Sequence, residues 1–278
     1  MNILKDRIKK FKEITKNFKH EEIASLVVAH KINKKKFKKL SDAAKKYVQL
    51  SKKYKFINRT PNGKIVPKKE VTNQYSKVIT SYRDVILSMK FESKIKKWVF
   101  PVVRYKDVKI DRKFNYRPNR SELPHSDIWA GWDSNSILIQ IPLLGDTKNN
   151  KVMYYEMPDK IKKNWFTKKT YKNAQNQFAR LCKPINHHYK KGYAYLSDIL
   201  VVHKTVKSKT CQPRASIDSP IILKSNQKKN SYGIGDCLNT IQIKNLEKKF
   251  AINCPLKMGE IDGVAGKKLP TSCEIIKL

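Results

Sequence analysis

The chain has 278 residues, a formal net charge of +38 at pH 7, and 40% hydrophobic residues. That share of apolar residues excludes a globally disordered chain in spite of the charge. The sequence contains no run of 18 or more apolar residues, which a membrane span would need, and its charged N-terminus does not resemble a signal peptide. We therefore expect no membrane insertion.

Residues 1–95 carry a helical pattern. Apolar residues recur at spacings of three and four within 3–18, 23–27, 37–50 and 75–89. This spacing predicts amphipathic helices with lysine-rich outer faces, and turn residues interrupt them between 58 and 67. We expect this region to pack on the core that follows.

The basic charge has two explanations, and the sequence leaves both open. The first 60 residues hold 19 lysines and arginines against 5 acidic residues, which favours an anionic partner such as nucleic acid. Lysine outnumbers arginine 52 to 9 in the whole chain, although nucleic-acid sites usually enrich arginine. The excess of lysine therefore favours a bias of composition, typical of an AT-rich genome, over a nucleic-acid site.

From residue 96 the pattern changes to short runs of β-branched and aromatic residues, separated by Pro, Gly, Asn and Asp. Several short strands of this kind predict a β sandwich or a jelly roll between residues 96 and 223. An insertion is expected near 159–190, and residues 224–278 form a C-terminal extension without a clear pattern. The expected strands are 99–105, 136–143, 151–157, 192–202 and 215–223.

The five cysteines form no CxxC pair and have no zinc-ligand spacing. We therefore expect reduced thiols in a cytoplasmic protein. These cysteines are Cys182, Cys211, Cys237, Cys254 and Cys273.

Three residues are candidate metal ligands. In an extended segment His125 and Asp127 project to the same side, because side chains two residues apart share a face. In a chain of this composition a His-x-Asp pair could almost arise by chance, so the pair alone is weak evidence. His203 follows the predicted strand 192–202 and can complete a set of two histidines and one carboxylate. The alternative for His203 alone is a hydrogen-bonded core histidine.

Arg214 is the only arginine after Arg180 in a chain that otherwise uses lysine. The planar guanidinium can bind a carboxylate through two parallel hydrogen bonds, which lysine cannot do. Ser216 lies on the same face of the predicted strand and can add a hydroxyl donor. A structural salt bridge is the alternative for Arg214 taken alone.

Together, His125-x-Asp127, His203 and Arg214-x-Ser216 resemble the signature of iron(II)- and 2-oxoglutarate-dependent oxygenases. Over residues 100–223 the chain is similar to the phytanoyl-CoA dioxygenase-like branch, nearest to oxygenases of streptomycin-type and other carbohydrate biosynthesis clusters. In those proteins a His-x-Asp segment with aromatic followers leads into a strand ending Ile-Pro-Leu, as 141–143 do here.

The resemblance implies a double-stranded β-helix, the cupin-like jelly roll, in a mainly β protein with N-terminal helices. It implies that His125, Asp127 and His203 hold Fe(II), and that Arg214 and Ser216 bind the distal carboxylate of 2-oxoglutarate. Dioxygen is the other co-substrate, and succinate and carbon dioxide are by-products. The expected reaction is hydroxylation of a small carbohydrate-like or nucleotide-linked metabolite, which can be anionic, with no catalytic residue beyond the metal ligands.

Four further residues are candidates for the same site. Gln140 can donate to the C1 carboxylate of 2-oxoglutarate, although an exposed polar residue on a strand is an equal alternative. Trp129 and Trp132 are expected to line the substrate opening, and simple packing is their alternative. Arg104 is a candidate contact for an anion.

Other motifs are set aside. His20 lies in a lysine-rich segment predicted to be helical, and the pair His187-His188 lacks a third ligand. Gly233-Ile234-Gly235 lacks the third glycine of a dinucleotide-binding loop. Two other functions remain open: a basic nucleic-acid-binding protein on a degenerate β scaffold, and an oxygenase that acts on nucleic acid or protein.

Overall fold

The structure is a computed structural model. It describes residues 3–57, 63–65, 69–99, 101–108, 121–130, 132–167, 169, 173–224, 237–238, 250–253 and 274–277. The glycine pair at 233 and 235 and the cysteines at 254 and 273 lie outside these ranges.

The described helices are α1 (Ile3–Thr15), α2 (Lys34–Lys53) and α3 (Thr72–Leu87). The described strands are β1 (Glu21–Ala24), β2 (Val27–Lys31), β3 (Ile95–Val99), β4 (Val102–Lys106), β5 (Ser136–Gly145), β6 (Asn150–Glu156), β7 (Lys183–Pro184), β8 (Tyr193–Asp198), β9 (His203–Lys207), β10 (Arg214–Leu223), β11 (Cys237–Leu238), β12 (Phe250–Asn253) and β13 (Glu274–Lys277). The short helical turns are η2 (Lys69–Val71), η3 (Glu92–Lys94), η5 (Asp127–Ala130), η6 (Lys163–Phe166), the π-helical η7 (Ala174–Phe178) and η8 (Ala179–Leu181).

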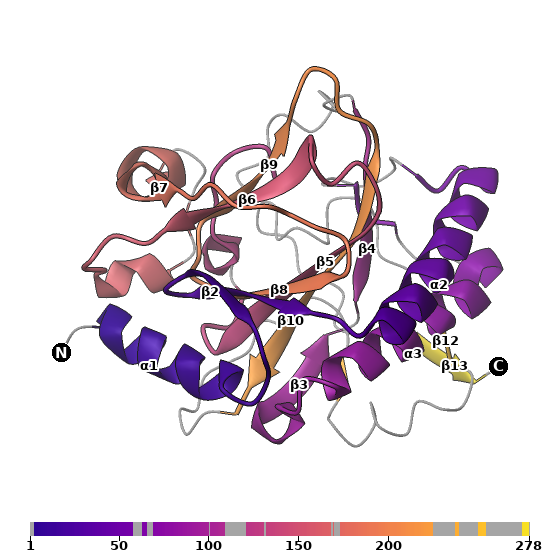
Figure 1. The fold of residues 1–278 in the computed structure, drawn as a ribbon, viewed down its shortest axis with the longest axis horizontal. Coiled ribbons are helices and arrows are strands. Elements are labelled where there is room, and N and C mark those ends of the chain that lie inside the picture. The colour runs from indigo at the N-terminus through magenta and orange to yellow at the C-terminus, as the bar shows by residue number, and fades with distance from the viewer. Residues whose placement is uncertain are drawn as a thin grey trace.

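The strands form one large and one small antiparallel sheet in the main body. The large sheet has the order β1-β2-β8-β5-β10-β3-β11, with β4 also paired to β10, and the small sheet has the order β7-β6-β9. In Figure 1 the strands β6 and β9 lie above β8 and β10. The prediction of a mainly β protein with N-terminal helices is therefore confirmed.

The strands β5 and β10 form the centre of the large sheet. Every residue of β10 is buried, and so are the first eight residues of β5. Strands covered on both faces need apolar residues at successive positions, which explains the nearly continuous hydrophobic run of residues 137–144 in β5. The strand β10 departs from this pattern with four buried polar residues, Arg214, Ser216, Asp218 and Ser219, of which the first three alternate and so share one face.

Residues 21–31 are a β hairpin, so the helix expected at 23–27 is wrong. The strands β1 and β2 pair with each other, and β2 also pairs with β8 of the large sheet. The consecutive residues Val27, Val28 and Ala29 are all buried. A strand between a hairpin partner and a sheet edge can bury consecutive residues, and this tertiary context overrides the local helical spacing. His20 thus precedes a strand and does not lie on a helix.

Three helices lie beside the sheets (Figure 1), and the packing of residues 1–95 as one region on the core stays a prediction. Asn33 caps α2 by accepting hydrogen bonds from the backbone of Lys35 and Lys36 at 3.0 and 3.3 Å. The buried face of α2 packs against α3 and β5. Figure 1 shows α2 and α3 together at one end of the sheet and α1 at the other.

The strands expected at 136–143, 151–157 and 215–223 are confirmed within two residues at each end. The strand expected at 99–105 is two strands, β3 and β4, with Pro101 between them. The strand expected at 192–202 ends at Asp198, and a turn separates it from β9. Residues 159–190 contain η6, η7, η8 and the two-residue β7, and their role as an insertion stays a prediction.

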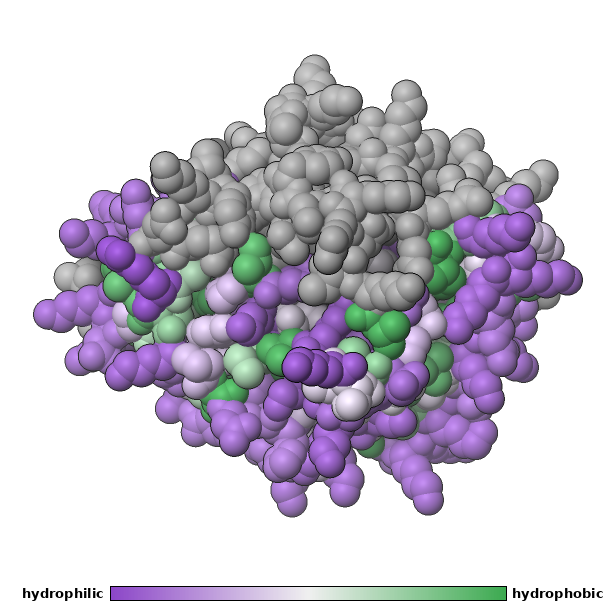
Figure 2. Space-filling view, turned by 90° about the horizontal axis from the view of Figure 1, so that it is seen from above, coloured by the Kyte–Doolittle hydropathy of each residue, from purple (hydrophilic) through white to green (hydrophobic). Residues whose placement is uncertain are grey.

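The described surface is mostly polar. Figure 2 shows hydrophilic side chains over most of the described part of one face, with hydrophobic ones scattered among them. No described helix combines the length and the apolar character needed to cross a bilayer. Cys182 and Cys211 are buried free thiols.

Candidate metal centre

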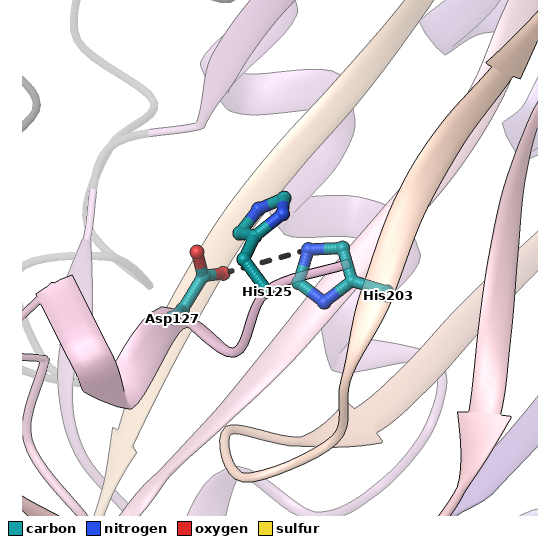
Figure 3. Close-up of side chains that lie close together, drawn as sticks. All are labelled: His125, Asp127 and His203. Carbon is teal, nitrogen blue, oxygen red and sulfur yellow. Dashed lines mark ion pairs between the residues drawn. The ribbon is translucent and has the colours of Figure 1, made fainter. Parts of the chain in front are cut away.

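The structure brings the three predicted metal ligands together. One ligand atom from each of His125, Asp127 and His203 lies within 4.8 Å of the others. The distance from Nε2 of His203 to Oδ2 of Asp127 is 4.0 Å, and the two imidazole centroids are 4.6 Å apart. Figure 3 shows the carboxylate and both rings grouped at one point between the strands. Two nitrogen donors and one oxygen donor match the facial triad that holds iron(II) in non-haem oxygenases.

Backbone pairing places the two histidines side by side. The amide of His125 donates to the carbonyl of His203 at 3.0 Å, and the reverse bond measures 2.9 Å. Between the two ligands of the first segment, the hydroxyl of Ser126 donates to the carbonyl of Ile199 at 2.9 Å. These three bonds join the His-x-Asp segment to the turn before β9, so the segments that carry the ligands are fixed relative to each other.

The turn from β8 to β9 determines where His203 lies. Asp198 ends β8, and its carboxylate accepts a hydrogen bond from the amide of Leu200 at 3.0 Å. Arg7 in α1 contacts both oxygens of the same carboxylate at 2.6 Å. Both contacts come from the single nitrogen Nη2, and this charged contact joins the N-terminal helix to the turn that positions a metal ligand.

One detail of the prediction is wrong. The sequence reasoning placed His125 and Asp127 in a single extended segment, but Asp127 begins the helical turn η5. The amide of Trp129 closes that turn by donating to the carbonyl of Ser126 at 3.1 Å. The two side chains still converge because the chain bends between them.

The local hydrogen bonds prepare both histidines to coordinate through Nε2. The Nδ1 atom of His125 lies 2.8 Å from the carbonyl of Leu123, and Nδ1 of His203 lies 3.2 Å from that of Val201. A carbonyl only accepts, so Nδ1 carries the proton and Nε2 keeps its lone pair. Such a bond on the far nitrogen is the usual support of a metal-bound histidine.

The charges at the centre favour a cation. Burial, with His203 next in importance, lowers the pKa of His125 to about 3, so this ring is neutral at pH 7. Burial raises the pKa of Asp127, and the nearby carboxylate of Asp218 raises it further, against the attraction of His203 and Arg104. A bound metal ion would compensate the buried carboxylate and would accept the imidazole lone pairs.

Arg214 is the first residue of β10 and is 2% exposed. Its Nε and Nη1 atoms are buried and contact no hydrogen-bond acceptor among the described residues. Each buried donor without an acceptor costs about 1–3 kcal/mol. The salt-bridge alternative does not account for these two nitrogens, whereas a bound carboxylate would.

The polar face of β10 faces two neighbouring strands. Ser216 lies opposite Arg104 of β4, and Asp218 lies opposite Gln140 of β5. Nε of Arg104 donates to the carboxylate of Asp218. Burial alone would raise the pKa of Asp218, but Arg104, with His203 and Lys64, holds it below its usual range. The contact of Arg104 with a substrate anion stays a prediction, and its contact in the structure is with Asp218.

Gln140 is 5% exposed, so the alternative of an exposed strand residue is wrong. The hydroxyl of Tyr154 donates to Oε1 of Gln140 at 2.5 Å. With Oε1 accepting, the amide nitrogen has its two hydrogen atoms to donate to a ligand. Sequence reasoning missed Tyr154, because nothing in the pattern of 151–157 indicates a partner on β5.

The two tryptophans occupy different environments. Trp129 is fully buried, and its ring centroid lies 5.5 Å from that of Trp165 and 5.8 Å from that of Phe178. Both partners belong to the insertion, so Trp129 holds the insertion against η5. Trp132 is half-buried and packs on the edge of the core. A substrate contact by either ring stays a prediction.

A buried lysine lies beside Arg214. Lys106 is 4% exposed, is paired with Arg214 across β4 and β10, and donates from Nζ to the hydroxyl of Ser121. Burial lowers the pKa of Lys106 to about 7, Glu122 opposes this shift, and Arg104 and Arg214 add to it.

This lysine makes the stability of the protein depend on pH. Between about pH 7 and pH 10.5 the unfolded chain binds a proton at Lys106 that the folded chain does not, so the free energy of unfolding rises with pH across that window. We expect Lys106→Met to lack this rise. The free energy of unfolding of the variant minus that of wild type should therefore decrease by about 1–3 kcal/mol between pH 7.5 and pH 10. Urea unfolding at several pH values measures it.

The control for this experiment is Lys45→Met, which changes an exposed lysine of α2. Its unfolding curve should follow wild type at every pH. If the free energy of unfolding of Lys106→Met depended on pH as that of wild type does, the lowered pKa of Lys106 would be contradicted.

No family model and no curated protein matches the sequence. Solved structures that the chain resembles include SnoN, a non-heme alpha ketoglutarate dependent epimerase from nogalamycin biosynthesis, at 9% identity and a TM-score of 0.47 over 78% of this chain and 83% of that chain. AviO1 from Streptomyces viridochromogenes Tue57 has 9% identity and a TM-score of 0.49 over 80% of this chain and 97% of that one. EctD from S. alaskensis, solved with 2-oxoglutarate and 5-hydroxyectoine, has 14% identity and a TM-score of 0.46 over 74% and 75%. Non-heme enzymes thus recur among the structural neighbours, which include an epimerase, a carbocyclase and a monooxygenase.

Proposed function

We propose that the chain is a non-haem iron(II)- and 2-oxoglutarate-dependent oxygenase that hydroxylates a small carbohydrate-like or nucleotide-linked metabolite, which can be anionic. The observation that carries the proposal is the convergence of His125, Asp127 and His203 beside a strand that begins with Arg214, a buried arginine with two unpartnered donors. The imidazole and carboxylate donors suit the metal, and the buried guanidinium suits the co-substrate.

Each group has a separate task in this proposal. Bound iron, 2-oxoglutarate and dioxygen supply the oxidising power, and the protein supplies position and exclusion of water. The triad holds the ion, while Arg214 and Ser216 bind the distal carboxylate. The amide of Gln140, oriented by Tyr154, donates to the C1 carboxylate. Burial of Arg214, Ser216 and Gln140 strengthens their interactions with the anionic co-substrate, because water does not screen them there.

The proposal extends to the architecture. We take the two sheets as the halves of a double-stranded β-helix spanning residues 96–223, with residues 1–95 packed on it and 224–278 as an extension. The hairpin β1/β2 lengthens the large sheet from within the first 95 residues. Trp129, Trp132 and Arg104 are proposed to border the substrate space.

The direct test uses purified protein under anaerobic conditions. Addition of iron(II) and then 2-oxoglutarate should give a weak visible charge-transfer band that neither component gives alone, and admission of air should release succinate. Iron(II) with succinate in place of 2-oxoglutarate is the control. A protein that gives neither the band nor succinate is not an enzyme of this class.

A second candidate function has one observation in its favour. The outer face of α2 exposes a row of lysines, which suits a polyanion. These lysines are Lys34, Lys35, Lys38, Lys39, Lys45 and Lys46. The chain would then bind nucleic acid, or act as an oxygenase on nucleic acid or protein. Binding to DNA or RNA that persists at physiological salt, with a measurable dependence on salt concentration, would favour this alternative.

A further inference from the structure

The segment between β7 and β8 brings polar side chains against Arg214 that the proposed function does not use. Tyr189 is 3% exposed, and its hydroxyl has no hydrogen-bond partner among the described residues. Cζ of Arg214 lies 5.2 Å from the centroid of the Tyr189 ring. Two neighbouring side chains, 25 positions apart in the sequence, thus both have buried polar atoms without a hydrogen-bond partner among the described residues.

Unpartnered groups of this kind are rare inside proteins, where the great majority of buried polar atoms have a hydrogen-bond partner. Nε and Nη1 of Arg214 can only donate. Burial raises the pKa of Tyr189 well above its usual value, so its hydroxyl keeps its proton and is a donor as well. The guanidinium of Arg214 lies over the Tyr189 ring, so one acceptor with several lone pairs beside this pair could serve donors of both side chains, and a carboxylate is such a group.

We infer that the hydroxyl of Tyr189 is a hydrogen-bond donor to the same carboxylate that Arg214 binds, so that the segment 185–190 helps to select a 2-oxo acid with a second carboxylate. This inference rests on the proposed function and adds a specificity-determining residue to it. In this segment the sequence indicated only the pair His187-His188 as a candidate, and that pair lacks a third ligand for a metal site.

The segment is built to hold Tyr189 in place. The hydroxyl of Tyr195 donates to the carbonyl of His188 at 2.6 Å and accepts from the amide of Lys190 at 2.7 Å. One side chain of β8 therefore ties down the backbone on both sides of Tyr189. The rings of Tyr189 and Tyr195 also pack, with centroids 4.8 Å apart. Such preorganisation lowers the entropy that ligand binding would otherwise cost.

The test compares two 2-oxo acids of equal chain length that differ in the distal carboxylate. In the anaerobic iron(II) protein, binding of 2-oxoglutarate and of 2-oxopentanoate is measured by titration of the visible band or by calorimetry. Tyr189→Phe removes one hydroxyl, and we expect it to weaken 2-oxoglutarate binding about 10-fold while changing 2-oxopentanoate binding less than about 2-fold. The selectivity between the two acids should fall by the same factor.

The matched control is Tyr193→Phe. The hydroxyl of Tyr193 contacts Glu21 at 3.2 Å at the exposed edge of the sheet, so both affinities should match wild type. Tyr195→Phe is a second variant that keeps Tyr189 but loosens its backbone. It should reduce the same selectivity, and it keeps the inference testable if Tyr189→Phe does not fold.

The outcomes are distinguishable. An equal loss of affinity for both acids in Tyr189→Phe would show a structural role and overturn the inference. Unchanged 2-oxoglutarate affinity in that variant would overturn the inference while the proposed function stands. Wild-type protein that binds no 2-oxoglutarate would refute the proposed function, and the inference with it.

Discussion

Replacement of His203 by alanine is expected to abolish iron(II) binding and the activity that depends on it. The variant loses one of three donors, and the remaining pair, His125 and Asp127, cannot enclose an octahedral ion from one face. We expect the affinity for iron(II) to fall by at least about 100-fold, given that loss of an outer supporting group alone costs 10- to 100-fold in metal sites. Anaerobic equilibrium dialysis measures the affinity, and the band with 2-oxoglutarate should disappear.

The chain offers a matched control in His20. Its Nδ1 lies 2.9 Å from the carbonyl of Phe18, two residues earlier, which is the same local bond that His203 makes to Val201. Among the described residues, His20 belongs to no group of metal-ligating side chains. His20→Ala should therefore bind iron(II) as wild type does. If His203→Ala retained full iron(II) binding and the band, the three residues would not be the metal site.

The second large effect is expected for Arg214→Met. Methionine has a similar length but has no donor and no charge, so the affinity for 2-oxoglutarate should fall by about 100-fold or more, consistent with the loss of a bidentate charged contact. Iron(II) binding without co-substrate should persist. Without 2-oxoglutarate the variant should be as stable as wild type or more stable, because it no longer buries two unpartnered donors. Calorimetric titration and urea unfolding measure the two quantities.

Arg7→Met is expected to lower the stability of the protein, in contrast to Arg214→Met. Arg7 contacts both carboxylate oxygens of Asp198 at 2.6 Å and donates to the carbonyl of Ser134 at 2.6 Å. Its removal leaves the buried Asp198 uncompensated and should lower the free energy of unfolding by about 3–5 kcal/mol. If Arg214→Met lost stability to the same extent without ligand, Arg214 would be a structural arginine and the carboxylate site would be refuted.

Local features of the sequence were enough to nominate the candidate site. The pair His125 and Asp127 stands out because of its residue types and close spacing, and Arg214 stands out because arginine is scarce. Alternation along a strand has a period of two, so Arg214 and Ser216 could be assigned to one face without knowledge of the neighbouring strands. The same rule extended by two residues would have found Asp218, which the sequence reasoning missed.

Other parts of the molecule depend on contacts between distant segments. Residues 23–27 have helical spacing, yet they lie in a hairpin because the edge of β8 was available to β2. Gln140 was as consistent with the surface as with the site until Tyr154 was found hydrogen-bonded to it. No sequence motif includes Tyr189, and its position beside Arg214 arises from the fold of the segment between β7 and β8.

By itself, the sequence determined the kinds of group available for chemistry, the mainly β character of residues 96–223 and the shared face of Arg214 and Ser216, because these follow from residue type and short-range periodicity. The tertiary structure alone decided that His203 pairs with His125, that α1 contacts the turn before His203, that Tyr154 donates to Gln140, and that Tyr189 lies against Arg214. These contacts join residues far apart in the chain, and their geometry depends on the packing of the whole sheet, which no local pattern encodes.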